Sequence, residues 1–201
     1  MMRRTVLAGL ILIVGAFGAP AILAAADPAA VINNLGNRAL EVLGKNATPA
    51  QRVARFHELF REDFDVPGLA RFVLGRYWKT ATPEEQTEFV KLFEDYIALV
   101  YSNQLAAYSG EKLKVTGSRT SAEEAIVASE IIRPAGTPPV KVDWHLTDRN
   151  GTYKISDVMV DGISMAVTQR SEFASVIQRS GGQVAGLIAQ LREKTAAAAP
   201  H

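Results

Sequence analysis

The 201-residue chain contains no cysteine. Disulfide bonds, thiolate metal sites, cysteine nucleophiles and lipid-modified cysteines are therefore excluded. A chain without disulfides depends on its hydrophobic core for stability, and a chain of this length can bury a sizeable core. The absence of cysteine thus directs attention to apolar packing rather than to covalent or thiolate chemistry.

A strong charge of either sign is also lacking. Lys and Arg total 22 against 21 Asp and Glu, and no basic cluster with interleaved aromatic residues occurs. A nucleic-acid partner is therefore not expected. Histidine is scarce, and none of His57, His145 and His201 has a partner histidine at metal-ligand spacing. We interpret all three as surface residues and expect neither a metal ion nor a cofactor.

The one long apolar run lies at the amino terminus. A positive head, Met1–Arg4, precedes an uncharged stretch from Thr5 to Ala19, and small residues follow at Ala24–Ala26. This arrangement is typical of a secretory signal peptide. The apolar stretch is shorter than the ~20 residues that a membrane-spanning helix needs. The sequence predicts a signal peptide at 1–26, a single domain at 27–195 and a frayed tail at 196–201.

The first half of the chain contains four helix-start signals. Each combines a capping side chain with a proline in the first turn, where a missing backbone N–H costs nothing. The four are Asp27-Pro28, Thr48-Pro49, Asp65-Val66-Pro67 and Thr82-Pro83. The fourth helix is predicted to be the longest and to end near Ser109-Gly110. Its one apolar stripe consists of Phe89, Phe93, Tyr96 and Val100, widened by Leu92 and Leu99.

After Gly110 the pattern changes to alternation, which predicts strands. Val142, Trp144 and Leu146 alternate with polar residues, and Asn150-Gly151 is a strong hairpin-turn signal. The return strand carries Tyr153, Ile155, Val158 and Val160, and earlier strands are predicted near Leu113–Val115 and from Ala125 to Ile132. Helices are predicted from Met165 to Ile177 and, after a break at 180–182, through Val184 and Leu191.

This order of elements predicts an α+β domain. A curved antiparallel sheet of about four strands has one apolar face, which must be covered by helices. The helices could close a core against this face or leave a pocket between sheet and helices, and periodicity does not distinguish the two outcomes.

No pattern of catalytic residues is complete. The run Gly162–Ala166 lacks the last glycine of a nucleophile elbow, and Gly181-Gly182-Gln183 lacks the spacing of a phosphate-binding loop. Asp157 and Asp161 flank a strand end without a further acid in register. We therefore expect no catalytic group. What remains is a set of aromatic side chains. Such a set more often fills a closed core than lines a ligand pocket.

Three longer blocks of the sequence resemble those of a known protein family. The blocks are 70–105, 140–165 and 169–194, with G-R-x-W at 75–78, T-x-x-E-x-x-x-F at 82–89, V-x-W at 142–144, V-x-G-I-S at 160–164 and R-x-x-F at 170–173. Together they resemble the toluene-tolerance (MlaC) family, and the last block is most similar to the hopanoid-biosynthesis-associated branch HpnM. Many relatives have tyrosine where this chain has Gln169, which favours a distinct branch.

The resemblance implies a fold similar to that of nuclear transport factors, with a deep apolar pocket for lipid tails between sheet and helices. It implies a non-catalytic, soluble periplasmic carrier of phospholipid or a hopanoid-type lipid. The implied partners are the lipid, an inner-membrane transporter complex of the ABC or RND type and an outer-membrane lipoprotein complex. On this basis the expected pocket residues are Phe72, Tyr77, Trp78, Phe89, Phe93, Tyr96, Val100, Val127, Val142, Trp144, Leu146 and Ile155.

Two other classes of function fit the same fold. A small-molecule isomerase or hydratase would need a buried acid or histidine inside the pocket with a tuned pKa, whereas Asp143 and His145 fall on the opposite face of their strand. An adaptor that binds only protein partners would have a filled core and no ligand.

Overall fold

The computed structural model describes residues 27–42, 47–105, 110–134 and 136–197. The predicted signal peptide and the last four residues of the predicted tail lie outside these ranges, as do residues 106–109, where the long helix was expected to end. Among the described residues, no helix is both long and apolar enough to cross a membrane.

The described residues form an α+β structure, as predicted. The helices are α1 (Pro28–Val42), α2 (Pro49–Asp63), α3 (Val66–Leu74), the short 3₁₀ helix η1 (Gly75–Lys79), α4 (Pro83–Leu105), α5 (Met165–Arg179) and α6 (Val184–Ala197). The strands are β1 (Lys112–Thr120), β2 (Glu124–Ile132), β3 (Val140–Arg149), β4 (Thr152–Val160) and β5 (Ile163–Ser164). The sheet is antiparallel in the order β1-β2-β3-β4-β5, so the four predicted strands gain a two-residue fifth.

The capping signals place all four helix starts correctly. At the first, α1 begins at Pro28 and the Asp27 carboxylate accepts the Ala29 N–H at 3.0 Å. Thr48 and Gln51 form a full capping box at α2, since the Thr48 hydroxyl accepts the Gln51 N–H at 3.2 Å and the Gln51 side chain accepts the Thr48 N–H at 2.9 Å. Thr82 and Glu85 repeat this exchange at α4. The Asp65 carboxylate caps α3 by accepting the Gly68 N–H at 3.2 Å.

The hairpin between β3 and β4 contains both a tight turn and a bulge. Asn150 and Gly151 both have positive φ, 57° and 84°, as the predicted two-residue turn requires. Further along, His145 pairs with Asp157 but Leu146 pairs with Ile155, so Ser156 is the extra residue of a β-bulge. The bulge explains why the apolar residues of β4 skip from 155 to 158 and still share one face.

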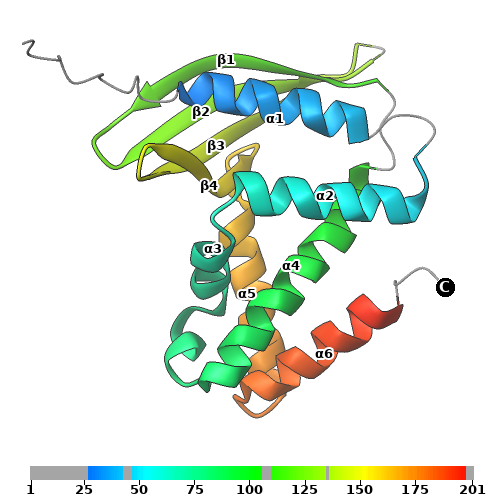
Figure 1. Cartoon of the computed structure of the whole chain (residues 1–201), viewed down its shortest axis with the longest axis vertical. Coiled ribbons are helices and arrows are strands. Elements are labelled where there is room, and N and C mark those ends of the chain that lie inside the picture. The colour runs from blue at the N-terminus through cyan, green and yellow to red at the C-terminus, as the bar shows by residue number, and fades with distance from the viewer. Residues whose placement is uncertain (1–26, 43–46, 106–109, 135, 198–201) are drawn as a thin grey trace, which may run out of the picture.

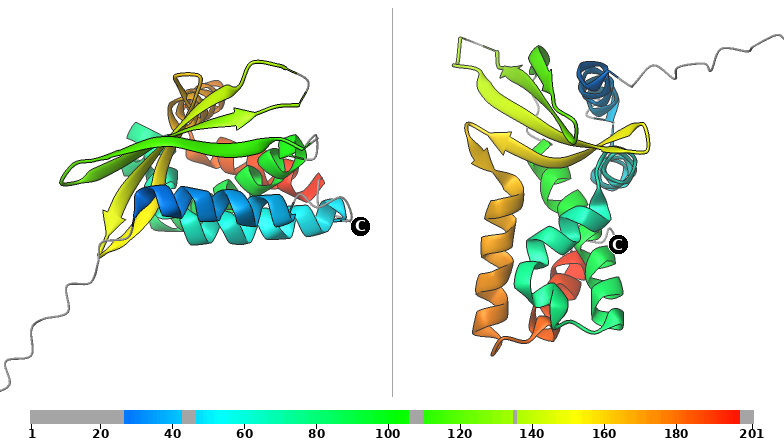
Figure 2. Two further views of the ribbon diagram at one scale, coloured as in Figure 1. Left: turned by 90° about the horizontal axis from the view of Figure 1, so that it is seen from above. Right: turned by 90° about the vertical axis from the view of Figure 1, so that its left-hand side faces the viewer.

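Figure 1 shows the sheet and α1 at one end of the molecule and α3, α4, α5 and α6 extending away from it, with α2 between. In Figure 2 the sheet curves over α1. One buried cluster lies between the sheet and α1 and includes Ile32, Val127, Leu146 and Ile155. The other lies among α3, α4, α5 and α6 and is centred on Phe89, Phe93 and Phe173. Phe64 packs against both clusters.

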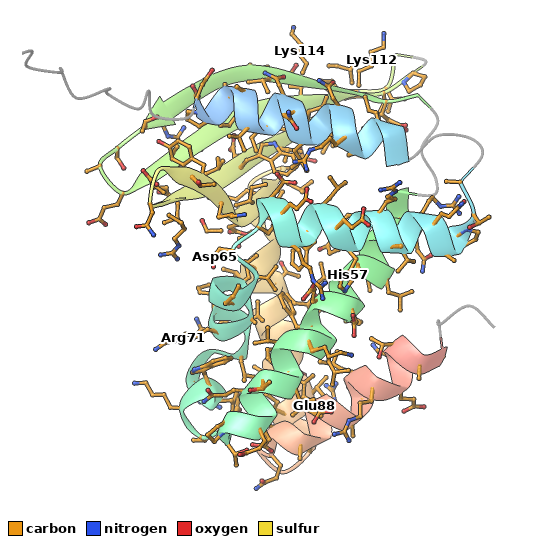
Figure 3. The ribbon with its side chains drawn as sticks, in the orientation of Figure 1. His57, Asp65, Arg71, Glu88, Lys112 and Lys114 are labelled. Atoms are coloured by element: carbon orange, nitrogen blue, oxygen red, sulfur yellow. The ribbon has the colours of Figure 1, made fainter. Side chains whose placement is uncertain are left out.

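The corner between α2 and α3 joins the helical half to the sheet. The Asp65 N–H donates to the Ile155 carbonyl of β4 at 2.9 Å, and Phe64 forms a bridge with Ile155. Arg149 of β3 pairs with the Asp65 carboxylate at 2.5 Å, which Figure 3 places at the corner. Gly68 makes room for this carboxylate, because a Cβ there would lie 2.3 Å from Asp65 Oδ2.

A second ion pair holds α1 to the same corner. Arg38 of α1 donates to both Asp63 oxygens, at 2.5 and 2.6 Å, and to Glu62 at 2.7 Å. Asp63 is only 8% exposed, and burial raises the pKa of its carboxyl although the hydrogen bond from Arg38 opposes that shift. The Arg38 pair therefore compensates a desolvated carboxylate and fixes the position of α1 under the sheet.

Asp65 should be the most sensitive polar residue of the corner. We expect Asp65→Ala to lower the free energy of unfolding by about 1 kcal/mol or somewhat more, because the helix cap and the Arg149 partner are both lost. Asp65→Asn retains an oxygen that can cap Gly68 and loses only the ion pair with Arg149, whose side chain is more than half exposed, so it should recover most of the stability. Urea denaturation measures both, and equal destabilisation by the two substitutions would contradict this role of the cap.

Candidate functional site

A cavity of about 680 Å³ lies between the two buried clusters. Its walls come from α1, α2, α3, α4, the inner face of the sheet and the first turn of α5, and they are almost entirely apolar. The helical side contributes Leu35, Ala39, Leu40, Phe56, Leu59, Phe60, Leu69, Val73, Phe93, Ile97 and Tyr101. The sheet side contributes Leu113, Ile131, Val142, Trp144, Val158 and Val160.

The cavity opens at one end of the sheet. Its exposed lining residues are Gln104 at the end of α4, Lys112 at the start of β1, Asp161 after β4 and Ile163 in β5. The strand register places these ends together, since β1 starts opposite the end of β2 and β4 ends opposite the start of β3. The mouth is therefore polar on several sides, whereas the interior is apolar.

Three of the twelve residues expected in the pocket line the cavity: Phe93, Val142 and Trp144. Val127, Leu146 and Ile155 are fully buried in the cluster under the sheet, and Phe89 is fully buried among the helices. Tyr77, Trp78 and Val100 are partly buried outside the lining, Tyr96 lines a separate groove between α4, α5 and α6, and Phe72 is 41% exposed. As lipid contacts, all twelve remain predictions.

Two helices, α1 and α2, line the cavity although no residue of either was expected there. Leu35 and Leu40 of α1 face the cavity, as do Phe56 and Leu59 of α2. Their helical spacing identifies them as buried, but spacing does not tell which helix lies opposite which strand. Tyr101 stacks on Phe56 with ring centroids 6.3 Å apart, so it joins α4 to α2 at the wall of the cavity.

Trp144 presents its ring to the cavity and has its polar group satisfied within the sheet. The indole N–H donates to the Ser129 hydroxyl at 2.9 Å, and that hydroxyl donates to the Val142 carbonyl at 3.0 Å. Ser129 is only 3% exposed. Because a buried N–H without an acceptor is costly, Ser129 fixes the orientation of Trp144 and leaves carbon atoms on the cavity wall.

Asp157 is one of the acids that line the cavity, and its hydrogen bonds are structural. One oxygen accepts the N–H groups of Val158 and Ala166 at 2.8 and 3.1 Å, and the other accepts the Ser164 hydroxyl at 2.5 Å. Ser164 in turn caps α5 by accepting the Val167 N–H at 3.0 Å. The pair therefore holds the start of α5 against β4, where the negative charge also suits the helix dipole.

Two histidines are more enclosed than expected, and neither lines the cavity. The His57 side chain is 20% exposed, with Nε2 2.9 Å from Asp95 and Nδ1 3.2 Å from Glu94, so it joins α2 to α4 (Figure 3). His145 Nδ1 lies 2.6 Å from Glu124 on the outer face of the sheet. The described residues contain no group of three acids or histidines that could hold a metal ion. Both histidines therefore make structural contacts between neighbouring elements.

Comparison with known proteins gives a consistent family. A family model described as MlaC protein matches residues 33–193. The chain is 24% identical over 113 residues to the intermembrane phospholipid transport system binding protein MlaC of Haemophilus influenzae, covering 54% of this chain and 53% of that protein. It is 25% identical over 122 residues to the toluene tolerance protein ttg2D of Pseudomonas putida, covering 60% and 56%. The matches thus span just over half the length of these relatives.

A solved structure has the same fold. It is the phospholipid-binding protein of Ralstonia solanacearum in complex with a phospholipid, with a TM-score of 0.73 and 22% sequence identity. The similarity covers 87% of this chain and all of that one. The curved sheet with its covering helices is therefore a shared architecture.

Ser129 offers a direct test of how the cavity wall is held. Ser129→Ala leaves the Trp144 N–H without its acceptor, so we expect the free energy of unfolding to fall by about 1 kcal/mol and the tryptophan emission to change. Ser118→Ala, at an exposed position of β1, is the matched control and should have little effect. If both substitutions gave the same small effect, the Ser129–Trp144 hydrogen bond would not be structurally important.

Proposed function

The chain belongs to the MlaC protein family, and on that premise we propose that it is a carrier that holds the apolar tails of a membrane lipid in its cavity. The observation that supports the proposal most is the cavity of about 680 Å³ with apolar walls and a polar mouth. The relatives named above, a phospholipid transport binding protein and a phospholipid-binding protein, point to the same class of ligand.

The physical requirement is the removal of acyl chains from water. Each exposed CH₂ group costs about 0.8 kcal/mol in water, so a single long acyl chain outside a membrane needs an apolar enclosure. A CH₂ group occupies about the same volume as a water molecule, roughly 30 Å³. A cavity of about 680 Å³ therefore holds on the order of twenty CH₂ groups, which is about one long acyl chain. Such a carrier needs no catalytic group for this task.

The arrangement of lining residues favours recognition of tails over headgroups. Trp144, Phe56 and Phe93 lie along the interior, whereas Gln104, Lys112 and Asp161 lie where the cavity meets the surface. A lipid that enters with its tails first would leave its headgroup among polar side chains and water. Selectivity would then come from tail length and shape, because apolar contacts are not directional.

We place this carrier in the periplasm, between inner and outer membranes. The amino-terminal pattern at 1–26 supports export, and the curated relatives include a protein of an intermembrane transport system. The cargo is a phospholipid or a hopanoid-type lipid, the second on the basis of the resemblance to HpnM. The partners would be an inner-membrane complex of the ABC or RND type and an outer-membrane lipoprotein complex, whose relative affinities set the direction of transport.

The direct test is to identify what the protein carries when it is exported and purified without detergent. Native mass spectrometry should show a mass excess that disappears on denaturation, and lipid extraction should identify the ligand. A phospholipid and a hopanoid differ in mass and in phosphorus content, so one preparation distinguishes the two cargoes. Protein that is free of lipid, and that also fails to take up lipid from vesicles, would refute the proposal.

Filling the cavity should abolish carriage while leaving the fold intact. Ala39 lies on α1 and lines the cavity, so the large side chain of Ala39→Trp would occupy volume that the lipid tails need. We expect a several-fold drop in the lipid-to-protein ratio. Ala54→Trp, at an exposed position of α2, is the matched control and should keep the ratio of the unmodified protein. A cooperative thermal melt must accompany both measurements, and unchanged lipid content in a folded Ala39→Trp protein would contradict the assignment of the cavity.

A further inference from the structure

The exposed apolar side chains of the described residues are concentrated on one face. Of the four large hydrophobic side chains that are exposed, three are Phe72 of α3 (41% exposed), Ile163 of β5 (60%) and Val167 in the first turn of α5 (52%). α3 and α5 pack side by side, as the right-hand view of Figure 2 shows. Ile163 also lines the mouth of the cavity, so the apolar lining continues onto this surface.

Arg170 connects the two helices at this face. Its guanidinium lies 5.2 Å from the centre of the Phe72 ring, a distance at which a cation and an aromatic ring attract each other. Gly75 makes this position possible, because a Cβ there would lie 2.8 Å from Arg170 Nε. On α5, Arg170 lies three residues beyond Val167 and therefore on the same side of the helix. The apolar residues are thus next to a fixed positive charge.

The same segments carry positive charge only. Residues 66–79 contain Arg71, Arg76 and Lys79, residues 163–171 contain Arg170, and neither range contains an acid. Arg71 extends away from α3 (Figure 3). The acids that flank these ranges each have a polar partner. Asp65 pairs with Arg149, Asp161 accepts the Lys141 N–H, and Glu172 accepts a hydrogen bond from the Gln169 side chain. Asp161 and Glu172 are exposed, so basic residues outnumber acids on this face without excluding them.

We propose that this face, defined by Phe72, Ile163, Val167, Arg71 and Arg170, binds the surface of an anionic lipid bilayer. Exposed apolar side chains surrounded by Arg and Lys are the combination that inserts shallowly among lipid headgroups. A protein partner would have to supply acids at matching positions, whereas a bilayer offers phosphates to guanidinium groups at any spacing. Contact through Ile163 places the cavity mouth at the membrane, where a lipid could pass without crossing bulk water.

Vesicle sedimentation tests this face without reference to the cargo. The exported protein should bind vesicles of phosphatidylglycerol mixed with phosphatidylcholine, and it should bind pure phosphatidylcholine at least tenfold more weakly. Added salt should weaken the binding, because the interaction of exposed charges is screened. Equal binding to the two kinds of vesicle, or none to either, would overturn the proposal. Absence of binding would leave the face to a protein partner.

Two variants with matched controls localise the binding to this face. Arg71→Glu should weaken binding to the anionic vesicles by roughly tenfold, since each basic residue near such a surface contributes appreciably. Arg119→Glu makes the same change at an exposed position near the end of β1 and should change binding much less. Val167→Ser should weaken binding several-fold, whereas Ile132→Ser, at the remaining exposed apolar position on β2, should not. Equal losses for variant and control in either pair would refute the assignment.

The lipid-to-protein ratio, measured on the same preparations, separates this inference from the proposed function. Arg71 and Val167 do not line the cavity, so both variants should retain the cargo of the unmodified protein. A protein that carries no lipid but binds anionic vesicles through this face would support the membrane face and contradict the carrier. A protein that carries lipid but shows no preference for anionic vesicles would support the carrier and contradict the membrane face.

Discussion

The attachment of the α2–α3 corner to β4 is the interaction on which the rest of the structure depends. β4 pairs with β5 over only two residues, so the backbone groups along the rest of this edge need other partners. The Asp65 N–H is one such partner, because it donates to the Ile155 carbonyl. Arg149 fixes the Asp65 side chain, and Arg38 fixes Asp63, two residues earlier. This corner sets how far the helices stand from the sheet, and the cavity is the space left between them.

The walls of the cavity are held in place by contacts within the protein. Phe60 and Phe93 belong to the aromatic cluster of the helical half, with ring centroids 6.1 Å apart, and Trp144 is held by Ser129 within the sheet. These three wall residues thus have packing or hydrogen-bond partners on the side away from the cavity. The interior still lacks dispersion contacts on one side, and an apolar ligand would restore them, so a lipid tail is a natural complement to this space.

The mouth of the cavity joins the site to the outer surface. Ile163 belongs to both, and the Asp157–Ser164 hydrogen bond fixes the turn that positions it at the start of α5. A carrier must exchange its cargo as well as hold it, and exchange is easiest where the apolar lining reaches the surface. The fold provides that continuity at the junction of β4, β5 and α5, next to the positively charged surface of α3.

The sequence alone determined the local structure. Proline and capping side chains at Asp27, Thr48, Asp65 and Thr82 predicted four helix starts, and Asn150-Gly151 predicted the hairpin turn. These features depend on neighbouring residues, so they can be read from the chain. Only the tertiary structure decided which apolar residues face the cavity. Trp144 lines it while Leu146, two residues along the same face, is fully buried, because α1 packs against one part of the sheet and leaves the other uncovered.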